Sequence, residues 1–190
     1  GAIYGWDLAA RWWLERKPGG NNDASQEYPV DLASDAQTVY LLDTNNGRIW
    51  KRNGNDWTVL VTNANLEGGI RMAVAGDIFV LTGERPGHAP RLLRVRGAAV
   101  GEVKVSGGME QPSLIVPGAG GLLLVDRGFR RVRLIEPDTG NGREILAGSD
   151  AAVLALAYTS ESSVLVGQDW LEPIRGQLPD QLGVRPTGSA

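Results

Sequence analysis

The sequence predicts an all-β protein built from repeated short strands. Five stretches share one pattern, in which an apolar strand runs into a polar turn and then into a second strand. The turn positions are 7, 43, 82, 126 and 168, which are 36, 39, 44 and 42 residues apart. A repeat of about 40 residues made of short strands is typical of a β-propeller blade. The 26 glycines and 10 prolines suit many strands joined by tight turns.

The composition limits the class of protein. A chain of 190 residues can form one domain with a real core. The net charge of −3 argues against nonspecific nucleic-acid binding, so no nucleic-acid partner is expected. There is no cysteine, which excludes disulfides and thiolate chemistry and leads us to expect an extracytoplasmic, bacterial protein. No run approaches the roughly 18 apolar residues of a membrane span.

The repeats divide the chain into units near 1–27, 28–66, 67–109, 110–150 and 151–170, followed by a tail or linker at 171–190 that contains proline and glycine. In the second unit we expect strands at 28–33, 39–42, 48–51 and 57–61, with 48–51 alternating toward solvent. In the third, fourth and fifth units we expect them at 70–74, 78–81, 91–95, 99–105, 113–116, 122–125, 131–135, 143–146, 153–157 and 163–166. The predicted fold is a β-propeller, or an incomplete one, of about four to five four-stranded blades.

Both ends depart from this pattern. The first unit is expected to be a hairpin of strands at 3–7 and 11–14, and the alternative is a helix over 7–16 with Asp7 as its N-cap. The tail carries three prolines and does not resemble a strand that closes a ring. We therefore expect a piece of a longer protein, or a ring that another chain completes.

Two stretches carry a family resemblance. Residues 42–49 (Leu-Asp-Thr-Asn-Asn-Gly-Arg-Ile) and 125–132 (Val-Asp-Arg-Gly-Phe-Arg-Arg-Val) each place an aspartate at the end of an apolar strand, then a glycine-containing turn, then arginine with a β-branched residue. The pattern resembles the NHL and YVTN-type β-propeller superfamily over about residues 3–170, although the third and fifth units lack the aspartate. The resemblance implies a propeller that serves mostly as a recognition scaffold, or less commonly as a hydrolase or lyase.

The recurring carboxylates allow two interpretations. Asp7, Asp43 and Asp126 could form a ring that holds a cation, or each could accept hydrogen bonds that fix its own turn. We favour the second, because calcium needs six to eight oxygens gathered at one point. The resemblance to propeller lactonases implies a divalent cation held by Glu, Asn and Asp, and Glu15, Asn45 and Asp126 are of those types. No metal and no cofactor are predicted.

Catalytic motifs are not found. His88 is the only histidine, which excludes a metal site or proton relay that needs several histidines within this chain. No strained nucleophile motif accompanies any serine, so no catalytic residue is assigned. His88 and Arg85 lie in the long turn 83–90, which we predict to be a binding loop because loops on a rigid scaffold carry function.

Arginine and tryptophan supply the other binding candidates. Arg127, Arg130, Arg131 and Arg133 form a basic cluster, in which Arg131 and Arg133 are expected to share a solvated strand face. Arg130 is kept as a binding candidate. The six tryptophans are expected mainly to pack between blades, with exposed members stacking on sugars or anchoring a partner. The tryptophan binding candidates are Trp12, Trp13 and Trp50.

The functional prediction is a non-catalytic recognition or scaffold module in a larger bacterial assembly or polypeptide. Its partner would be a protein subunit or a glycan held by loops on one face. The alternative is a metal-dependent, lactonase-like hydrolase with carboxylates that converge in a central channel. A third hypothesis is that the chain completes the propeller ring of a partner subunit.

Overall fold

The computed structural model describes residues 2–5, 13–16, 29–35, 37–54, 56–118, 120–147, 153–158 and 164–168. These residues form sixteen β-strands and one 3₁₀ turn, η1 (Ala64–Leu66). The strands are β1 (Ala2–Gly5), β2 (Trp13–Arg16), β3 (Pro29–Ser34), β4 (Val39–Asp43), β5 (Arg48–Asn53), β6 (Asp56–Thr62), β7 (Gly69–Ala75), β8 (Asp77–Thr82), β9 (Leu92–Arg96), β10 (Ala99–Val103), β11 (Pro112–Gly118), β12 (Gly121–Asp126), β13 (Arg131–Ile135), β14 (Gly142–Ala147), β15 (Val153–Tyr158) and β16 (Val164–Gln168).

The strands form antiparallel sheets in which neighbours along the chain are neighbours in space. Three sheets have four strands each, β3 to β6, β7 to β10 and β11 to β14, and two have two strands each, β1 with β2 and β15 with β16. The expected hairpin in the first unit is confirmed, because Tyr4 in β1 pairs with Leu14 in β2. The helical alternative is therefore wrong for the residues of β2.

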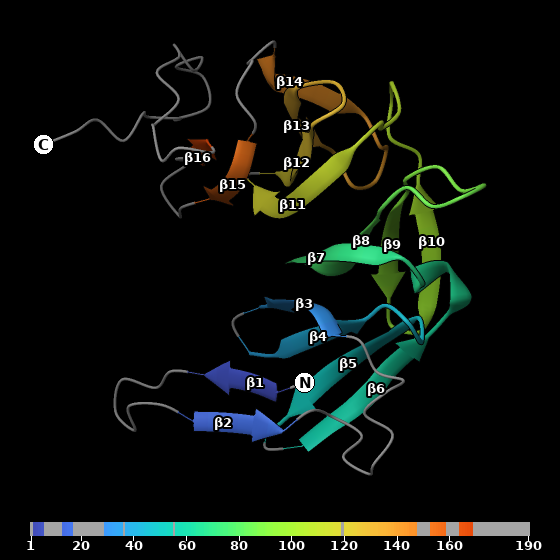
Figure 1. Ribbon diagram of the computed structural model, residues 1–190, viewed down its shortest axis with the longest axis vertical. Coiled ribbons are helices and arrows are strands. Elements are labelled where there is room, and N and C mark those ends of the chain that lie inside the picture. Colours follow the sequence, from blue (N-terminus) through green and yellow to red (C-terminus); the bar gives the residue numbers. More distant parts are fainter. Residues whose placement is uncertain are drawn as a thin grey trace, which may run out of the picture.

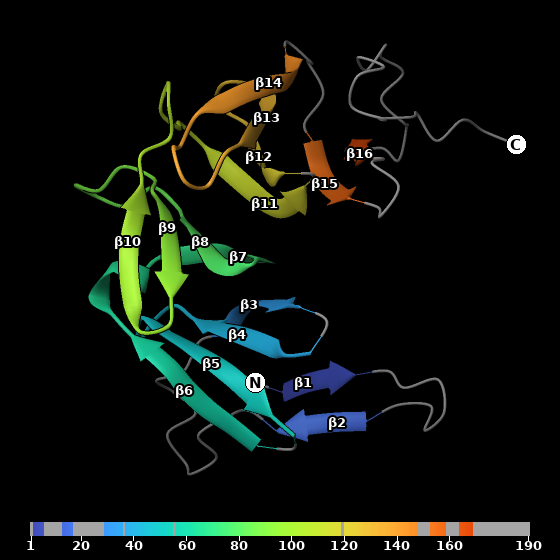
Figure 2. The ribbon, with the colours of Figure 1, turned by 180° about the vertical axis from the view of Figure 1, so that it is seen from behind.

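The sheets are arranged around a common centre (Figure 1). Their first strands β3, β7 and β11 contact one another in series, and β11 also contacts β15. The fourth strands β6, β10 and β14 lie at the periphery, as the view from behind also shows (Figure 2). Sheets stacked radially in this way are the blades of a β-propeller, which confirms the predicted fold class.

Two apolar layers hold the three full blades together. In the first, Leu42 and Ile49 of one blade pack with Val80 of the next. In the second, Phe79 of that blade packs with Leu124 of the third. Every blade in the middle of such a stack is covered on both faces, and the burial of apolar side chains there is the main source of stability.

This double coverage corrects one expectation about β5. The strand was expected to alternate toward solvent, yet Ile49 and its neighbour Trp50 are both buried although they point to opposite faces. All six residues of β12 are buried as well. A strand in the interior of a blade stack therefore shows no alternation of burial, because a neighbouring structure covers each face.

A β-bulge recurs in the first strand of each four-stranded blade and in β15. The pairing register shifts at Val30 in β3, at Ile70 in β7, at Ser113 in β11 and at Leu154 in β15. A bulge adds one unpaired residue and increases the local twist. Its repetition at one place makes the blades equivalent in detail. Among the residues that the structure describes, no helix is long and apolar enough to cross a membrane.

Candidate binding face

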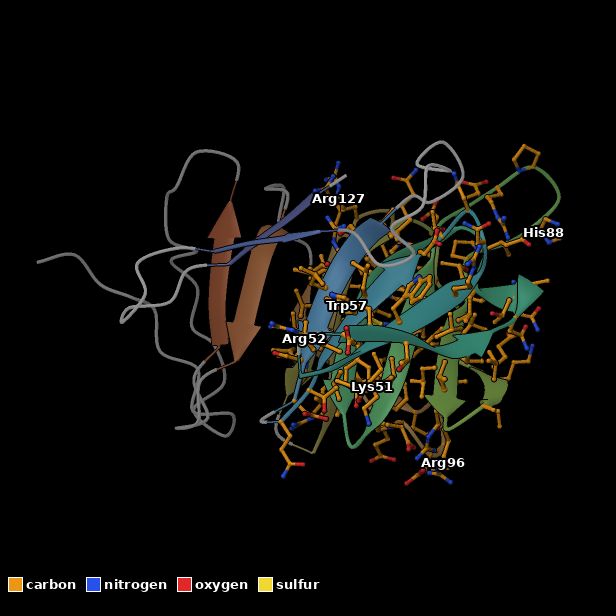
Figure 3. All side chains as sticks on the ribbon, turned by 90° about the horizontal axis from the view of Figure 1, so that it is seen from below. Lys51, Arg52, Trp57, His88, Arg96 and Arg127 are labelled. Carbon is orange, nitrogen blue, oxygen red and sulfur yellow. The ribbon has the colours of Figure 1, made fainter. Side chains whose placement is uncertain are left out.

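The turns that join the second strand to the third in each full blade define one face of the molecule, called here the loop face. It comprises turns 44–47, 83–91 and 127–130 together with the linkers 63–68 and 104–111 that lead from one blade to the next. Figure 3 shows Arg127 and His88 at this end of the sheets and Arg96 at the opposite end. Of the residues that the sequence analysis singled out for binding, Arg85, His88 and Arg130 lie on this face.

A buried carboxylate anchors the linker beside the third turn. Asp126, the last residue of β12, is 0% exposed and accepts hydrogen bonds from the backbone N–H groups of Glu110 and Gln111, each at 3.0 Å. Hydrogen bonds to a charged acceptor are stronger than neutral ones. Asp126 therefore fixes the linker that enters its own blade. It does accept backbone hydrogen bonds, as the second interpretation expects, but from this linker and not from the turn 127–130.

The other two turns are fixed by different groups at the same place. Thr82 is buried, and its Oγ1 accepts from the backbone N–H of Arg91 at 2.9 Å. Asp43 is also buried, and its Oδ2 accepts from Asn46 Nδ2 at 3.0 Å. Asp7 lies outside the described residues. Within the described part of the chain, no three His, Cys, Asp or Glu side chains gather in a way that could hold a metal ion.

Two members of the lactonase-like set, Asn45 and Asp126, lie on different blades. Asp126 uses its oxygens on backbone N–H groups, and Asn45 is exposed on the turn of another blade. The strand β2 contains Glu15, but its side chain lies outside the described residues. The set remains an untested prediction.

The long turn 83–90 is a compact hairpin. Arg85 and His88 exchange backbone hydrogen bonds, with N···O distances of 3.1 and 2.8 Å, and Gly87 between them adopts a φ of +78°. The Arg85 side chain is half-buried and covers Gly68, where an added Cβ would collide with its guanidinium. His88 is exposed at the tip (Figure 3). Of the two predicted binding residues in this turn, the structure presents His88 and uses Arg85 for packing.

The turn 127–130 presents an aromatic ring held by an arginine. Phe129 is 44% exposed, and the Arg131 guanidinium lies 4.0 Å from its ring centroid, in cation–π geometry. Arg131 also donates to the carbonyl oxygens of Gly107 and Gly108 at 3.2 and 3.4 Å. The ring is therefore supported from the linker. Sequence reasoning did not select Phe129. This residue nevertheless lies within the stretch 125–132, which carries the same motif as residues 42–49 of the first full blade.

Arg133 corrects the expectation of a solvated arginine face. It is 3% exposed and donates to the carbonyl oxygens of Ser106 and Gly108, both at 2.6 Å. Burial lowers the pKa of its guanidinium, with the charge of Arg131 acting in the same direction. The residue was misassigned because alternation along β13 does not show that linker carbonyls lie above it.

Arg130 occupies an unusual backbone position. Its φ is +48°, and among the described residues it is the one non-glycine residue with a positive φ. The turns 44–47 and 127–130 correspond residue by residue, so Arg130 stands where the first full blade has Gly47, with a φ of +54°. Side chains disfavour this conformation, which glycine adopts without penalty.

The tryptophan candidates divide between packing and undescribed positions. Trp50 is 8% exposed and lies beneath the Arg48 guanidinium, 5.7 Å from the ring centroid. This burial fits the packing interpretation and leaves little surface for a ligand. Trp12 lies outside the described residues, and Trp13 is described only as part of the backbone of β2.

A polar groove of about 490 Å³ lies between β9, β10 and the turn before β14, and Lys104 at the start of the linker 104–111 also lines it. Its central cation, Arg94, pairs with Asp77 and with Asp138 of the next blade, each at 2.5 Å. The hydrogen bond to Asp138, followed by that to Asp77, raises the pKa of Arg94. The charge of Arg94 is thus neutralised by two carboxylates of the protein, and the pair with Asp138 joins two blades.

The comparisons with known proteins report on the fold. No family model matches, and no curated protein matches. Among solved structures, a chain of a nidogen/laminin complex is 16% identical with a TM-score of 0.69, covering 88% of this chain and 67% of that chain. Virginiamycin B lyase from Staphylococcus aureus is 12% identical with a TM-score of 0.66, covering 90% and 57%. YCF48 bound to D1 peptide is 16% identical with a TM-score of 0.57, covering 85% and 52%.

The last two matches extend well beyond this chain, which spans 57% of the lyase and 52% of YCF48. At identities of 12 to 16%, these similarities show the fold alone. Together with the three four-stranded sheets around a common centre, they show that the chain folds as a β-propeller.

Proposed function

We propose that this chain is a recognition module that binds a partner protein through its loop face. The observation that supports this most is the way the three turns are held. A buried side chain at the end of each second strand, Asp43, Thr82 or Asp126, binds its own turn or linker. Turns fixed in this way lose little conformational entropy when a partner binds, which favours affinity.

The exposed side chains on this face suit a protein partner. Phe129, Arg127 and His88 are exposed there, and aromatic residues and arginine are enriched at the cores of protein interfaces. The nidogen/laminin and YCF48/D1 chains are propellers seen with a protein or peptide, which adds support by analogy of fold. A bacterial, extracytoplasmic setting within a larger assembly belongs to the same proposal and rests on the absence of cysteine.

The experiment that tests this proposal is selection from a displayed library of random peptides. The wild-type chain would be compared with the double variant His88→Ala/Phe129→Ala, and with Arg96→Ala at the opposite end of the sheets as a control. We expect peptides that bind the wild type and the control but not the double variant. A glycan array and lactone hydrolysis with added divalent cations would run in parallel.

Each other outcome has a clear meaning. Enriched peptides that bind the double variant as well as the wild type would place recognition elsewhere and contradict the proposal. If the chain binds a glycan and no peptide, the partner is a glycan and not a protein. If the purified variant chains hydrolyse lactones when a divalent cation is added, the result would favour the hydrolase.

A further inference from the structure

We infer that an extended strand of a partner protein adds to the free edge of β1 and covers Leu32 in the first full blade. The inference goes beyond the proposed function, because it concerns the inner strands around the centre and not the loop face. Three observations carry it: an apolar row with an exposed inner end, two matching rows that are covered there, and an unpaired edge on β1.

One apolar residue from each strand of the first full blade forms a row across the sheet. The pairing registers align Leu32 with Leu41, Leu41 with Trp50, and Trp50 with Val59. The two middle residues are 3% and 8% exposed, whereas Leu32 and Val59 at the two ends are 45% and 44% exposed. The hairpin of β1 and β2 lies beside this blade (Figures 1 and 3). A neighbour of two strands covers the middle of a four-stranded sheet and leaves both ends open.

The matching rows of the other two full blades are covered at their inner ends. Met72 takes the place of Leu32 in the second full blade and is 4% exposed, and Ile115 does so in the third and is 2% exposed. The first strand of the preceding blade covers each of them. Ala33 of β3 packs against the cluster that contains Met72, and Ala73 of β7 belongs to the cluster that contains the third blade's residue. Leu32 therefore has the position of an interface residue, and what it lacks is a first strand beside it.

The outer end of the row needs no partner. Val59 corresponds to Glu102 in the second full blade and to Glu144 in the third. Both glutamates are exposed although a full blade precedes each of them. An exposed side chain at this position is thus compatible with a complete junction between blades, and single exposed apolar residues are ordinary on protein surfaces. The added strand is expected at the inner end alone, which makes Val59 a matched control.

The strand β1 offers the backbone partner for such a strand. In each full blade the second strand is hydrogen-bonded on both edges, to the first strand and to the third. The repeat makes β1 the second strand of its unit, because it precedes turn position 7 as β4 precedes turn position 43. Among the described strands, β1 pairs with β2 only. An open edge of this kind presents N–H and C=O groups to which an extended segment can add.

The strands that cover the matching positions define the chemistry of the partner. Each contributes a β-branched residue and, three positions later, an alanine: Val30 and Ala33 in β3, and Ile70 and Ala73 in β7. The occupant of the site over Leu32 is therefore an extended apolar segment with this pattern. Its docking continues an interface that already buries Leu41 and Trp50 in the same row. Apolar contact with Leu32 and backbone pairing with β1 act together, which selects a strand over a helix or an irregular loop.

The experiment exploits the absence of cysteine from the chain. Leu32→Cys and Val59→Cys each introduce a single thiol at nearly equal exposure on the same face of the same blade. The probe is a synthetic peptide of residues 69–75 with Ala73→Cys, supplied as a mixed disulfide with cysteamine. A scrambled peptide and a peptide that also carries Met72→Pro, which disfavours a strand, are the controls. Each protein is equilibrated with each peptide at rising reductant, and the captured fraction is measured by intact-protein mass spectrometry.

Two further measurements separate strand addition from nonspecific apolar contact. Hydrogen exchange of residues 2–5 is followed with and without the captured peptide, because pairing protects the backbone N–H groups of β1. Fluorescence polarisation uses the labelled peptide without cysteine and compares the wild type with Leu32→Asp and Val59→Asp. Both substitutions place a charge at an exposed position, so both chains are expected to fold.

We expect Leu32→Cys to capture the strand peptide about fivefold or more in preference to the scrambled and proline peptides, a ratio typical of a specific contact. Val59→Cys should show no preference among the three. Capture at position 32 should slow hydrogen exchange in β1. Leu32→Asp should weaken binding of the labelled peptide by a similar factor, whereas Val59→Asp should bind as the wild type does.

Four results would overturn the inference. They are equal capture of all peptides by Leu32→Cys, an equal preference shown by Val59→Cys, capture that leaves exchange in β1 unchanged, and no capture at all. If Leu32→Cys forms a disulfide-linked dimer in preference to capturing the peptide, the occupant is a second copy of this chain and not a partner strand. None of these results depends on the loop face, so the proposed function stands or fails separately.

Discussion

Replacing Asp126 by alanine tests the claim that a buried carboxylate holds the loop face in place. The change removes both oxygens that accept from the N–H groups of Glu110 and Gln111. A donor left without a partner costs about 1 to 3 kcal/mol, so two cost about 2 to 6 kcal/mol if no water replaces the carboxylate. Glu110 and Gln111 are themselves exposed, so water can reach part of the site and the lower half of that range is expected.

The assay is urea denaturation followed by tryptophan fluorescence, with amide hydrogen exchange at residues 110 and 111 as a local readout. A loss of about 2 to 4 kcal/mol is a large part of the 5 to 15 kcal/mol by which domains are usually stable. The matched control is Asp138→Ala. Its carboxylate is 82% exposed and pairs with Arg94 on the surface, so a loss under about 1 kcal/mol is expected. If Asp126→Ala costs no more than Asp138→Ala, the anchoring argument is refuted.

Three further substitutions test the interior. Trp50→Ala should lower the free energy of unfolding by about 3 to 5 kcal/mol in urea denaturation, because it removes a large buried ring and leaves a cavity, and a loss under about 1 kcal/mol would contradict core packing. Gly47→Ala should lower the melting temperature more than Gly54→Ala, since both have positive φ but only at Gly47 would the new Cβ strike the backbone of Asn63. Burial raises the pKa of Asp31, so wild-type stability should fall as pH rises from the ordinary carboxyl pKa through that of folded Asp31, and Asp31→Asn should remove this fall in pH-dependent denaturation. A pH profile that Asp31→Asn leaves unchanged would contradict a raised pKa at the half-buried Asp31.

The strands could be predicted from the sequence because each is encoded locally. The apolar run 122–125 predicts β12, and the turn residues on either side limit it to Gly121–Asp126. The spacing of such runs was enough to predict blades of four strands. The meander order follows from the same local signals, whereas strand ends were predicted less well, as in 99–105 for β10 (Ala99–Val103).

The details of the loop face depend on contacts between distant residues. The alternation of residues along its strand predicts that Arg133 is exposed. Its burial is possible because Ser106 and Gly108, 25 to 27 residues earlier, supply carbonyl oxygens that accept its hydrogen bonds. The bulged residues of the first strands share no residue type that would mark them in the sequence. The bulges are seen only in the pairing register. The match between Gly47 and Arg130 was readable by aligning the two turns, but its meaning required a φ value.

The anchors of the third full blade have a consequence for how the chain folds. Asp126 reaches residues only 15 and 16 positions earlier, and Arg133 reaches residues 25 and 27 positions earlier, all in the linker that enters the same blade. By contrast, the bond from Met72 N–H to Asp31, which joins two blades, spans 41 positions. Short spans close with little loss of chain entropy and favour fast, local folding. The third full blade can therefore secure its own starting point before the residues that follow it have left the ribosome, so assembly there can proceed in the order of synthesis.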